Sequence, residues 1–124
     1  MVVAVRAIRG AVQVDANARA DILEGTTELV TEVMTRNGLV TDDVISVVFT
    51  ATPDLDAEFP ALAARKMGWT ETALMCMREI PVPVSLPKCI RVLLHVNTSR
   101  SAAEMQHIYT RGAVSLRPNF GVDL

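Results

Sequence analysis

The clearest hydrophobic pattern in the chain lies in residues 86–96, LPKCIRVLLHV. At the two-residue period of a strand, alternate positions form one wholly apolar face: Ile90, Val92, Leu94 and Val96. The other face contains Arg91, whose guanidinium is costly to bury unless an anionic group meets it. The pattern therefore predicts a strand in which Arg91 either pairs with a protein carboxylate or faces a pocket that accepts an anion.

Four other segments have the apolar or β-branched composition of strands: residues 2–14, 44–51, 72–77 and 113–116. The first of them contains Arg9, a second arginine in an apolar strand, whose side chain either reaches solvent or joins Arg91 at an anion site. Residues 44–51, VISVVFTA, are almost unbroken in their hydrophobicity and predict a buried strand.

Three segments predict helices. A single apolar stripe follows Asn17, which we expect to be the N-cap, and the helix should end at Asn37-Gly38. Residues 56–67 predict a shorter helix with a proline near its first turn. A capping box at residues 101–104, SAAE, predicts a third helix that ends at Gly112.

Residues 80–87 contain three prolines, which forbid a regular ladder and predict a stiff loop. The element order is then β-α-β-α-β-β-α-β in one domain, residues 1–124. We expect an α/β (α+β) fold, a mixed five-stranded sheet with helices on one face. Three helices would leave the other sheet face uncovered, and an uncovered apolar face predicts an oligomer.

Composition excludes some functions. The net charge of -2 and the pI near 5.6 argue against a general nucleic-acid binder. Ten of the twelve basic residues are arginine, which grips carboxylates bidentately. Carboxylate binding explains that bias, and so does a GC-rich genome.

The chain has no pattern typical of a signal peptide, because Arg6 and Arg9 interrupt the apolar start, and no stretch of transmembrane length. We therefore expect a cytoplasmic protein that does not bind membranes. Cys76 and Cys89 lack metal-ligand spacing, so we expect two reduced thiols and no metal site.

No phosphate-binding glycine loop, nucleophile elbow or metal-binding helix motif occurs in the sequence. The candidates for chemistry are polar residues near element ends: Arg9, Arg65, Cys76, Glu79, Arg91, Tyr109 and Arg117. Arg9 and Arg91 could share an anion site. Alternatively, these are separate surface charges with one structural ion pair, such as Arg91 with Glu79.

Short motifs run in order along the whole chain: Arg6-Ala7-Ile8-Arg9-Gly10-Ala11; Ala51-Thr52-Pro53-Asp54-Leu55, Phe59-Pro60-Ala61 and Arg65; Gly68-Trp69; Cys76-Met77 with Glu79; Lys88-Cys89-Ile90-Arg91-Val92; and His107 with Tyr109, then Leu116-Arg117-Pro118. Together they resemble the barrel-type monofunctional chorismate mutases, a small trimeric bacterial class distinct from the all-helical one.

The resemblance implies a homotrimer that closes a pseudo-α/β-barrel, with three active sites between neighbouring subunits. It also implies the Claisen rearrangement of chorismate to prephenate, on the route to phenylalanine and tyrosine. That reaction is unimolecular and needs no nucleophile, cofactor or metal.

The resemblance also implies roles for individual residues. Arg91 would donate to the ether oxygen as negative charge grows on it. Arg9 and Tyr109 would bind carboxylates, and Glu79 would accept a hydrogen bond from the ring hydroxyl, with the Cys76 segment beside it.

Six further substrate-binding positions follow from the same resemblance: Phe59, Ala61, Arg65, Met75, Leu116 and Arg117. The first two would supply an apolar wall from across the subunit interface. Arg65 and Arg117 would lie at the mouth of the cleft, the latter on a tail that closes over the ligand. Met75 stands where relatives often carry threonine, and Leu62 stands where they often carry lysine, which puts the entrance contacts in question.

Two other functions fit parts of the pattern. A trimeric deaminase of reactive enamines and imines shares the barrel topology and binds carboxylates with arginine, and a non-catalytic trimer could bind small anions. Arg9 and Glu79 together favour the mutase, because a ring hydroxyl needs Glu79 and an imine acid does not.

Overall fold

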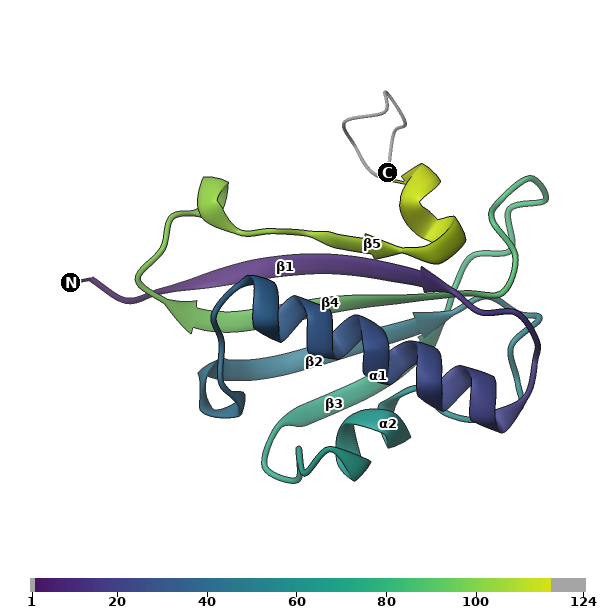
Figure 1. Cartoon of the computed structure of the whole chain (residues 1–124), viewed down its shortest axis with the longest axis horizontal. Coiled ribbons are helices and arrows are strands. Elements are labelled where there is room, and N and C mark those ends of the chain that lie inside the picture. The colour runs from purple at the N-terminus through teal and green to yellow at the C-terminus, as the bar shows by residue number, and fades with distance from the viewer. Residues whose placement is uncertain (1, 117–124) are drawn as a thin grey trace.

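The computed structural model describes residues 2–116 as a single mixed sheet with two α-helices. The elements are β1 (Ala4–Gln13), α1 (Arg19–Arg36), β2 (Val44–Ala51), α2 (Ala61–Lys66), β3 (Ala73–Arg78), β4 (Cys89–Thr98) and β5 (Ile108–Thr110) (Figure 1). Three short 3-10 turns are η1 (Thr41–Asp43), η2 (Ala102–Glu104) and η3 (Arg111–Leu116).

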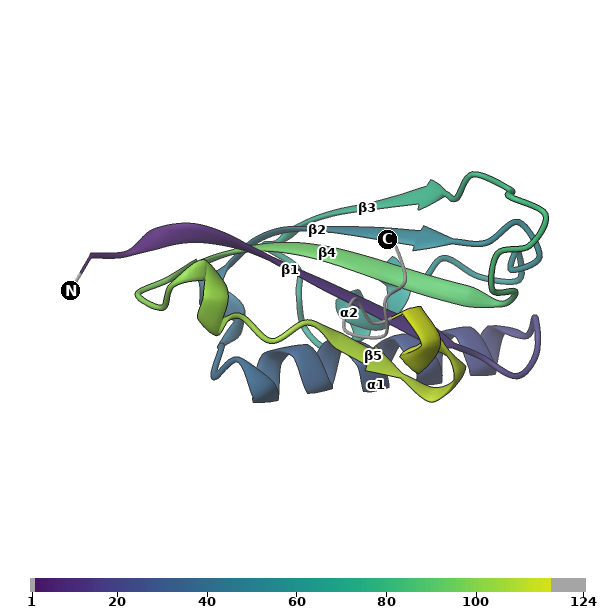
Figure 2. The same cartoon turned by 90° about the horizontal axis from the view of Figure 1, so that it is seen from above.

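The strand order is β3-β2-β4-β1-β5. The central strand β4 is antiparallel to both β1 and β2, whereas β5 and β3 at the two edges run parallel to their neighbours. Both helices lie on the same face of the sheet (Figure 2). The predicted fold class, a mixed five-stranded sheet with helices on one face, is confirmed.

The core lies between that face and α1. The apolar positions of β4 predicted to share a face are all buried, as are the matching positions of β1 and β2, among them Ile8, Val47 and Phe49. The apolar stripe of α1 is buried against them: Ile22, Leu29, Val30 and Val33. Each such side chain contributes about 1.5–3 kcal/mol by leaving water, which is why the helix packs here.

The predicted helix boundaries need two corrections near α1 and α2. Asn17 does not cap α1; Ala18 holds that position without a side-chain bond. The Asn17 amide instead accepts from the backbone N–H groups of Asp56 and Ala57 and donates to the Asp56 carboxylate. That tertiary contact keeps residues 56–59 in a loop, so α2 is shorter than predicted and begins after Pro60.

The predicted helix over residues 101–112 is wrong. The Ser101 capping box is present, with the Ser101 N–H on Glu104 Oε1, but the helix lasts a single turn. Ile108 and Thr110 are β-branched, and pairing with β1 satisfies the backbone of this segment while burying Ile108. Residues 113–116, predicted as a strand, lie in η3 instead.

Three further local predictions are confirmed. β2 has the predicted bounds, the proline-rich loop after β3 contains no strand, and the left-handed residue after α1 is Gly38, with φ +62°. Within residues 2–116, no helix is long and apolar enough to cross a membrane.

The second sheet face, which we call the open face, has no helix over it (Figure 2). Exposed apolar side chains lie on it, including Met75 (56% exposed), Met77 (52%) and Leu93 (36%). This face carries the polar residues considered next.

Candidate functional site

The strand register brings the candidate residues of the open face into two adjacent rows. One row runs across all five strands, since Tyr109 pairs with Ala11, Ala11 with Arg91, Arg91 with Thr50 and Thr50 with Met77. Ala11, which lies between Arg91 and Tyr109 in this row, is fully buried in a cluster against which Tyr109 packs.

A second row lies next to the first, two residues along each strand, and contains Arg9. Arg9 pairs with Leu93, Leu93 with Val48 and Val48 with Met75. A depression of about 370 Å³ lies over the two rows, and Arg9, Arg91 and Tyr109 all line it. The structure therefore brings together three of the predicted site residues from three different strands.

Glu79 joins this group from the loop after β3. Its backbone N–H donates to the Ala51 carbonyl (3.0 Å), which extends the pairing with β2 by one residue. Its carboxylate accepts from the Thr50 hydroxyl (Oγ1 to Oε2, 2.6 Å) and lies 3.2 Å from Arg91 Nε. The Nε–H does not point at that oxygen, so the contact is an ion pair without a hydrogen bond.

The sequence left two roles open for Arg91, pairing with a protein carboxylate or facing a pocket, and the structure shows both. Arg91 pairs with a protein carboxylate and also lines the depression. Glu79 is the one carboxylate within 4 Å of it among the described residues, and the Glu79 side chain is only 13% exposed. With Arg9 nearby, the site has an excess of positive charge and guanidinium N–H groups available for an anion.

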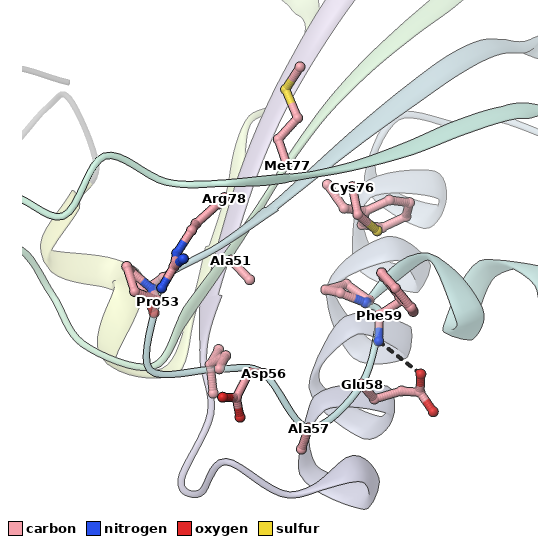
Figure 3. Close-up of a pocket in the computed structure, with 13 residues that line it drawn as sticks. Ala51, Pro53, Asp56, Ala57, Glu58, Phe59, Cys76, Met77 and Arg78 are labelled. Carbon is pink, nitrogen blue, oxygen red and sulfur yellow. Dashed lines mark hydrogen bonds between the residues drawn. The ribbon is translucent and has the colours of Figure 1, made fainter.

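Cys76 lies elsewhere. It pairs with Phe49 and so points to the helix side of the sheet, whereas Met75 faces the open side. There, Cys76 lines a second hollow of about 500 Å³ with Phe59, between β3 and the loop that leads to α2 (Figure 3). Within one chain, Cys76 and Phe59 are therefore separated from Arg91 by the sheet.

The positions on α2 differ in accessibility. Ala61 is buried in the first turn of α2, whereas Arg65 is exposed in the last turn. Phe59, just before the helix, is 66% exposed although it is a large apolar residue. An exposed aromatic beside an open hollow is typical of a surface that another molecule covers.

The C-terminal segment reaches the site through a small apolar cluster on the open face: Ala11, Cys89 and Ala113, with Leu86, Tyr109 and Leu116 packed against them. Burial raises the pKa of the Cys89 thiol to about 11, against the opposing effect of the Arg91 cation. Leu116 is the last described residue, and Arg117 lies outside the described residues.

Gly112 lets η3 lie close to β1. A Cβ on Gly112 would collide with the side-chain amide of Gln13, which itself donates to the Pro87 carbonyl (3.1 Å). A side chain at position 112 would therefore have to displace the Gln13 amide from the Pro87 carbonyl, at the point where the C-terminal segment meets the end of the proline-rich loop.

Two residues of the site had no predicted role. Thr50 lies in an apolar run, and only the pairing with β4 and Glu79 reveals its hydroxyl as a site group. His107 Nδ1 accepts from the backbone N–H of Arg9 (2.9 Å). Burial, and then the Arg9 cation, lower the pKa of His107. Neither contact has a signal in the sequence, because both depend on strand register.

Two arginines (Arg9 and Arg91), the Glu79 carboxylate and the Tyr109 phenol together suit the binding of a small polar anion. In residues 2–116 no cluster of histidine, cysteine or acidic residues could hold a metal ion. A family model described as chorismate mutase type I matches residues 5–120. The chain belongs to the type I chorismate mutase family.

Individual relatives agree. The chain is 42% identical over 116 residues to chorismate mutase AroH of Thermus thermophilus, and this alignment covers 93% of this chain and 95% of the relative. It is 37% identical over 119 residues to chorismate mutase AroH of Bacillus subtilis (strain 168), with 95% and 94% covered. A solved chorismate mutase structure from Clostridium thermocellum matches with a TM-score of 0.86 and 56% identity, over 87% of this chain and 96% of that one.

These findings confirm the predicted family, the isomerase class and the place in aromatic amino-acid biosynthesis, with chorismate as substrate and prephenate as product. They do not favour the imine deaminase or the non-catalytic anion-binding trimer.

Proposed function

We propose that this chorismate mutase is a cytoplasmic homotrimer, one domain per chain, in which the open sheet faces close a pseudo-α/β-barrel. Exposed Met75, Met77 and Leu93 on that face support an assembly that buries them. Each active site would then lie between neighbours. Arg9, Glu79, Arg91 and Tyr109 would come from one subunit, and the Phe59 hollow from the next.

The observation that carries this proposal is the Arg91–Glu79–Thr50 arrangement beside the depression. The Thr50 hydroxyl and the ion pair fix the Glu79 carboxylate, and Glu79 in turn restrains the Arg91 guanidinium. A cation held in place before the substrate arrives needs little reorganisation when charge develops.

The rearrangement breaks a C–O bond before the new C–C bond is complete, so negative charge grows on the ether oxygen. We assign Arg91 as the donor to that oxygen, which is worth roughly 3–4 kcal/mol by comparison with oxyanion-hole donors. Arg9 and Tyr109 would bind the substrate carboxylates and select its folded, chair-like shape.

Glu79 would accept a hydrogen bond from the ring hydroxyl, the one donor on a substrate otherwise rich in acceptors. Its oxygens already contact Thr50 and Arg91, so the ring hydroxyl of the substrate would donate to a lone pair of Glu79 that those contacts leave free. A carboxylate in a dianion-binding site is otherwise unfavourable, which supports a role in orientation.

The remaining predicted positions would complete the cleft. Phe59 and Ala61 would form its apolar wall from the helix side of one subunit, where Cys76 also lies, and Met75 would line it from the open face. Arg65 would stand at the mouth, where its exposure in the last turn of α2 suits an entering anion.

Two positions would come from the C-terminal segment. Leu116 would border the cleft beside Tyr109, since both pack in the same small cluster. Arg117, the other predicted substrate-binding residue of this segment, lies outside the described residues.

The first experiment measures loss of chorismate absorbance near neutral pH for the parent chain and for Arg91→Ala. We expect conversion to prephenate by the parent and a loss of about 10²–10³-fold in kcat for the variant. Arg36→Ala is the matched control, because Arg36 is an exposed arginine of α1 paired with Glu32. No conversion by a folded parent would exclude the proposal, and full activity in Arg91→Ala would return Arg91 to a structural role.

The assembly is tested by light scattering after size exclusion. The parent should have the mass of three chains. Leu93→Glu, at the centre of the open face, should lower that mass, whereas Thr31→Glu on the solvent side of α1 should not. A parent that elutes as a monomer and still converts chorismate would contradict the shared-site arrangement.

A further inference from the structure

His107 lies just before the edge strand β5, and the reaction described above gives it no task. Its Nδ1 accepts the backbone N–H of Arg9 at 2.9 Å. Arg9 is the residue of β1 whose guanidinium lines the depression. A side chain from the segment before β5 therefore holds the backbone of the residue that projects a cation into the site.

The backbone of β5 does not provide this acceptor. The β1–β5 ladder begins at Gly10 and Ile108, so Arg9 lies one residue beyond it. On the partner segment, Gln106 is already committed: its carbonyl accepts from the buried Asn37 amide (3.0 Å), and its N–H donates to the Asn37 oxygen (2.8 Å). The His107 imidazole takes the place that a backbone carbonyl would otherwise fill.

We propose that His107 in its neutral form is a positioning residue, which fixes the Arg9 backbone and so aims its guanidinium, and that protonation of His107 releases Arg9 and weakens substrate binding. The inference rests on the proposed function in one respect, namely that Arg9 binds a substrate carboxylate.

The surroundings of His107 favour the neutral form. From β1 the charged group that acts on it is Arg9. Along its own segment the next titratable residue in the sequence is Tyr109, and the end of α1 contributes the uncharged Asn37, which bonds the neighbouring Gln106. Burial and then the Arg9 cation lower the pKa of His107 below its ordinary value of 6.5, and no carboxylate among the described residues opposes them.

Protonation would place an N–H on Nδ1, facing the Arg9 N–H. The hydrogen bond would be lost, and two cations would lie close together. Because the folded-state pKa is the lower one, the arrangement is complete above pH 6.5 and is lost as the pH falls below that value.

The test compares kcat and KM across the acid range for the parent, His107→Asn, His107→Ala and the control His95→Asn. Asparagine places an oxygen acceptor near the position of Nδ1 and does not titrate. His95, the other histidine of the chain, bonds Ser46 instead. Any other group that titrates in this range affects all four proteins alike, so the ratio of each variant to the parent isolates His107.

We expect His107→Ala to raise KM about tenfold near neutral pH with kcat within about threefold, as for the loss of one hydrogen bond behind a binding group. His107→Asn should match the parent at neutral pH and exceed it in kcat/KM at acid pH, by up to about tenfold once His107 is protonated in the parent, whereas His95→Asn should follow the parent throughout. A His107→Asn ratio that does not change with pH would overturn the inference.

A second measurement is independent of activity. In NMR spectra of the parent, the Arg9 amide proton should shift with the same midpoint as the His107 ring, and in His107→Asn it should not shift in that range. An Arg9 amide that ignores the His107 titration would also overturn the inference. If the parent does not convert chorismate, the proposed function fails, and this measurement still decides the His107–Arg9 contact.

Discussion

The two faces of the sheet have different roles in this enzyme: one forms the hydrophobic core and the other carries the candidate site. On the helix side, neighbouring strands contribute Ile8, Phe49 and Leu94, all fully buried. On the open side, the adjacent positions in the same strands are Arg9, Thr50 and Leu93, which are exposed or half-buried. A shift of one residue along the chain thus moves from a group that stabilises the fold to a group that lines the depression.

The difference shows why the open face is not an ordinary solvated surface. A sheet with one wet face alternates apolar and polar residues. Here the second set is mixed, with polar groups gathered around Arg91 and Glu79 and apolar ones such as Met75 beside them. A polar patch within an exposed apolar surface is what a ligand site at a subunit interface requires.

The largest effect on stability should come from the helix side. Phe49→Ala removes the largest fully buried side chain and should lower the free energy of unfolding by about 3–5 kcal/mol. Urea unfolding followed by fluorescence of the single tryptophan, buried Trp69, measures it. Met75→Ala is the matched change on the opposite face of the sheet.

The Met75→Ala effect should depend on protein concentration, because the open face contributes through assembly. The Phe49→Ala loss should persist at every concentration. Equal losses that do not vary with concentration would mean that the two faces are not divided as we describe.

The next effect concerns the open face alone. Arg91→Lys keeps the charge but replaces a planar guanidinium by a point charge on a different stem, so we expect a loss of roughly 10²-fold or more in kcat. Its unfolding midpoint should stay close to that of the parent, since the Arg91–Glu79 pair is partly exposed. Chorismate conversion and thermal unfolding, measured on the same sample, check both statements. Near-parent activity would show that charge alone suffices.

Much of this division could be predicted from sequence. Alternation in residues 90–96 assigned the buried face of β4 correctly, and the run 44–51 gave β2 with its bounds. Arg91 was recognisable as a site residue because a guanidinium within an apolar strand needs an explanation. These inferences rest on local pattern, which a sequence displays directly.

The rest depends on partners distant in the chain. The capping box at Ser101 predicted a helix, but pairing of Ile108 with β1 outweighed that local signal. Asn17 is a residue type typical of helix N-caps, but its side-chain oxygen instead accepts a hydrogen bond from the Asp56 backbone N–H. Thr50 became a site residue only through the register that sets it against Arg91. These contacts join residues far apart in the sequence, so local sequence patterns do not predict them.

A smaller effect should separate the two contacts of Glu79. Thr50→Val removes the hydroxyl that donates to Glu79 and leaves the ion pair with Arg91. A hydrogen bond to a charged group contributes about 1.5–3 kcal/mol, of which part is recovered by solvent, so we expect about a tenfold loss in kcat/KM. Thr50→Ser retains the hydroxyl and should restore most of the activity. If serine and valine behave alike, the shape of Thr50 matters and its hydrogen bond does not.

The smallest effect concerns reactivity, and it tests how far the chain itself covers the open face. Cys89 lies on that face but is buried by the cluster that includes Ala113, and burial raises its pKa to about 11. Cys76 is half-buried beside the hollow on the helix side. Near pH 8 a thiol reagent should therefore modify Cys76 readily and Cys89 only after denaturation, because the thiolate is the reactive form.

Cys76→Ser should abolish the fast reaction and leave the slow one. The raised pKa also has a sign for stability: the contribution of the Cys89 thiol is complete below its ordinary value of 9.0 and is lost as the pH rises toward 11. Rapid modification of Cys89 in the native protein would show that η3 and Leu116 lift away from the sheet, and that the cluster beside Arg91 and Tyr109 does not cover the open face as its burial indicates.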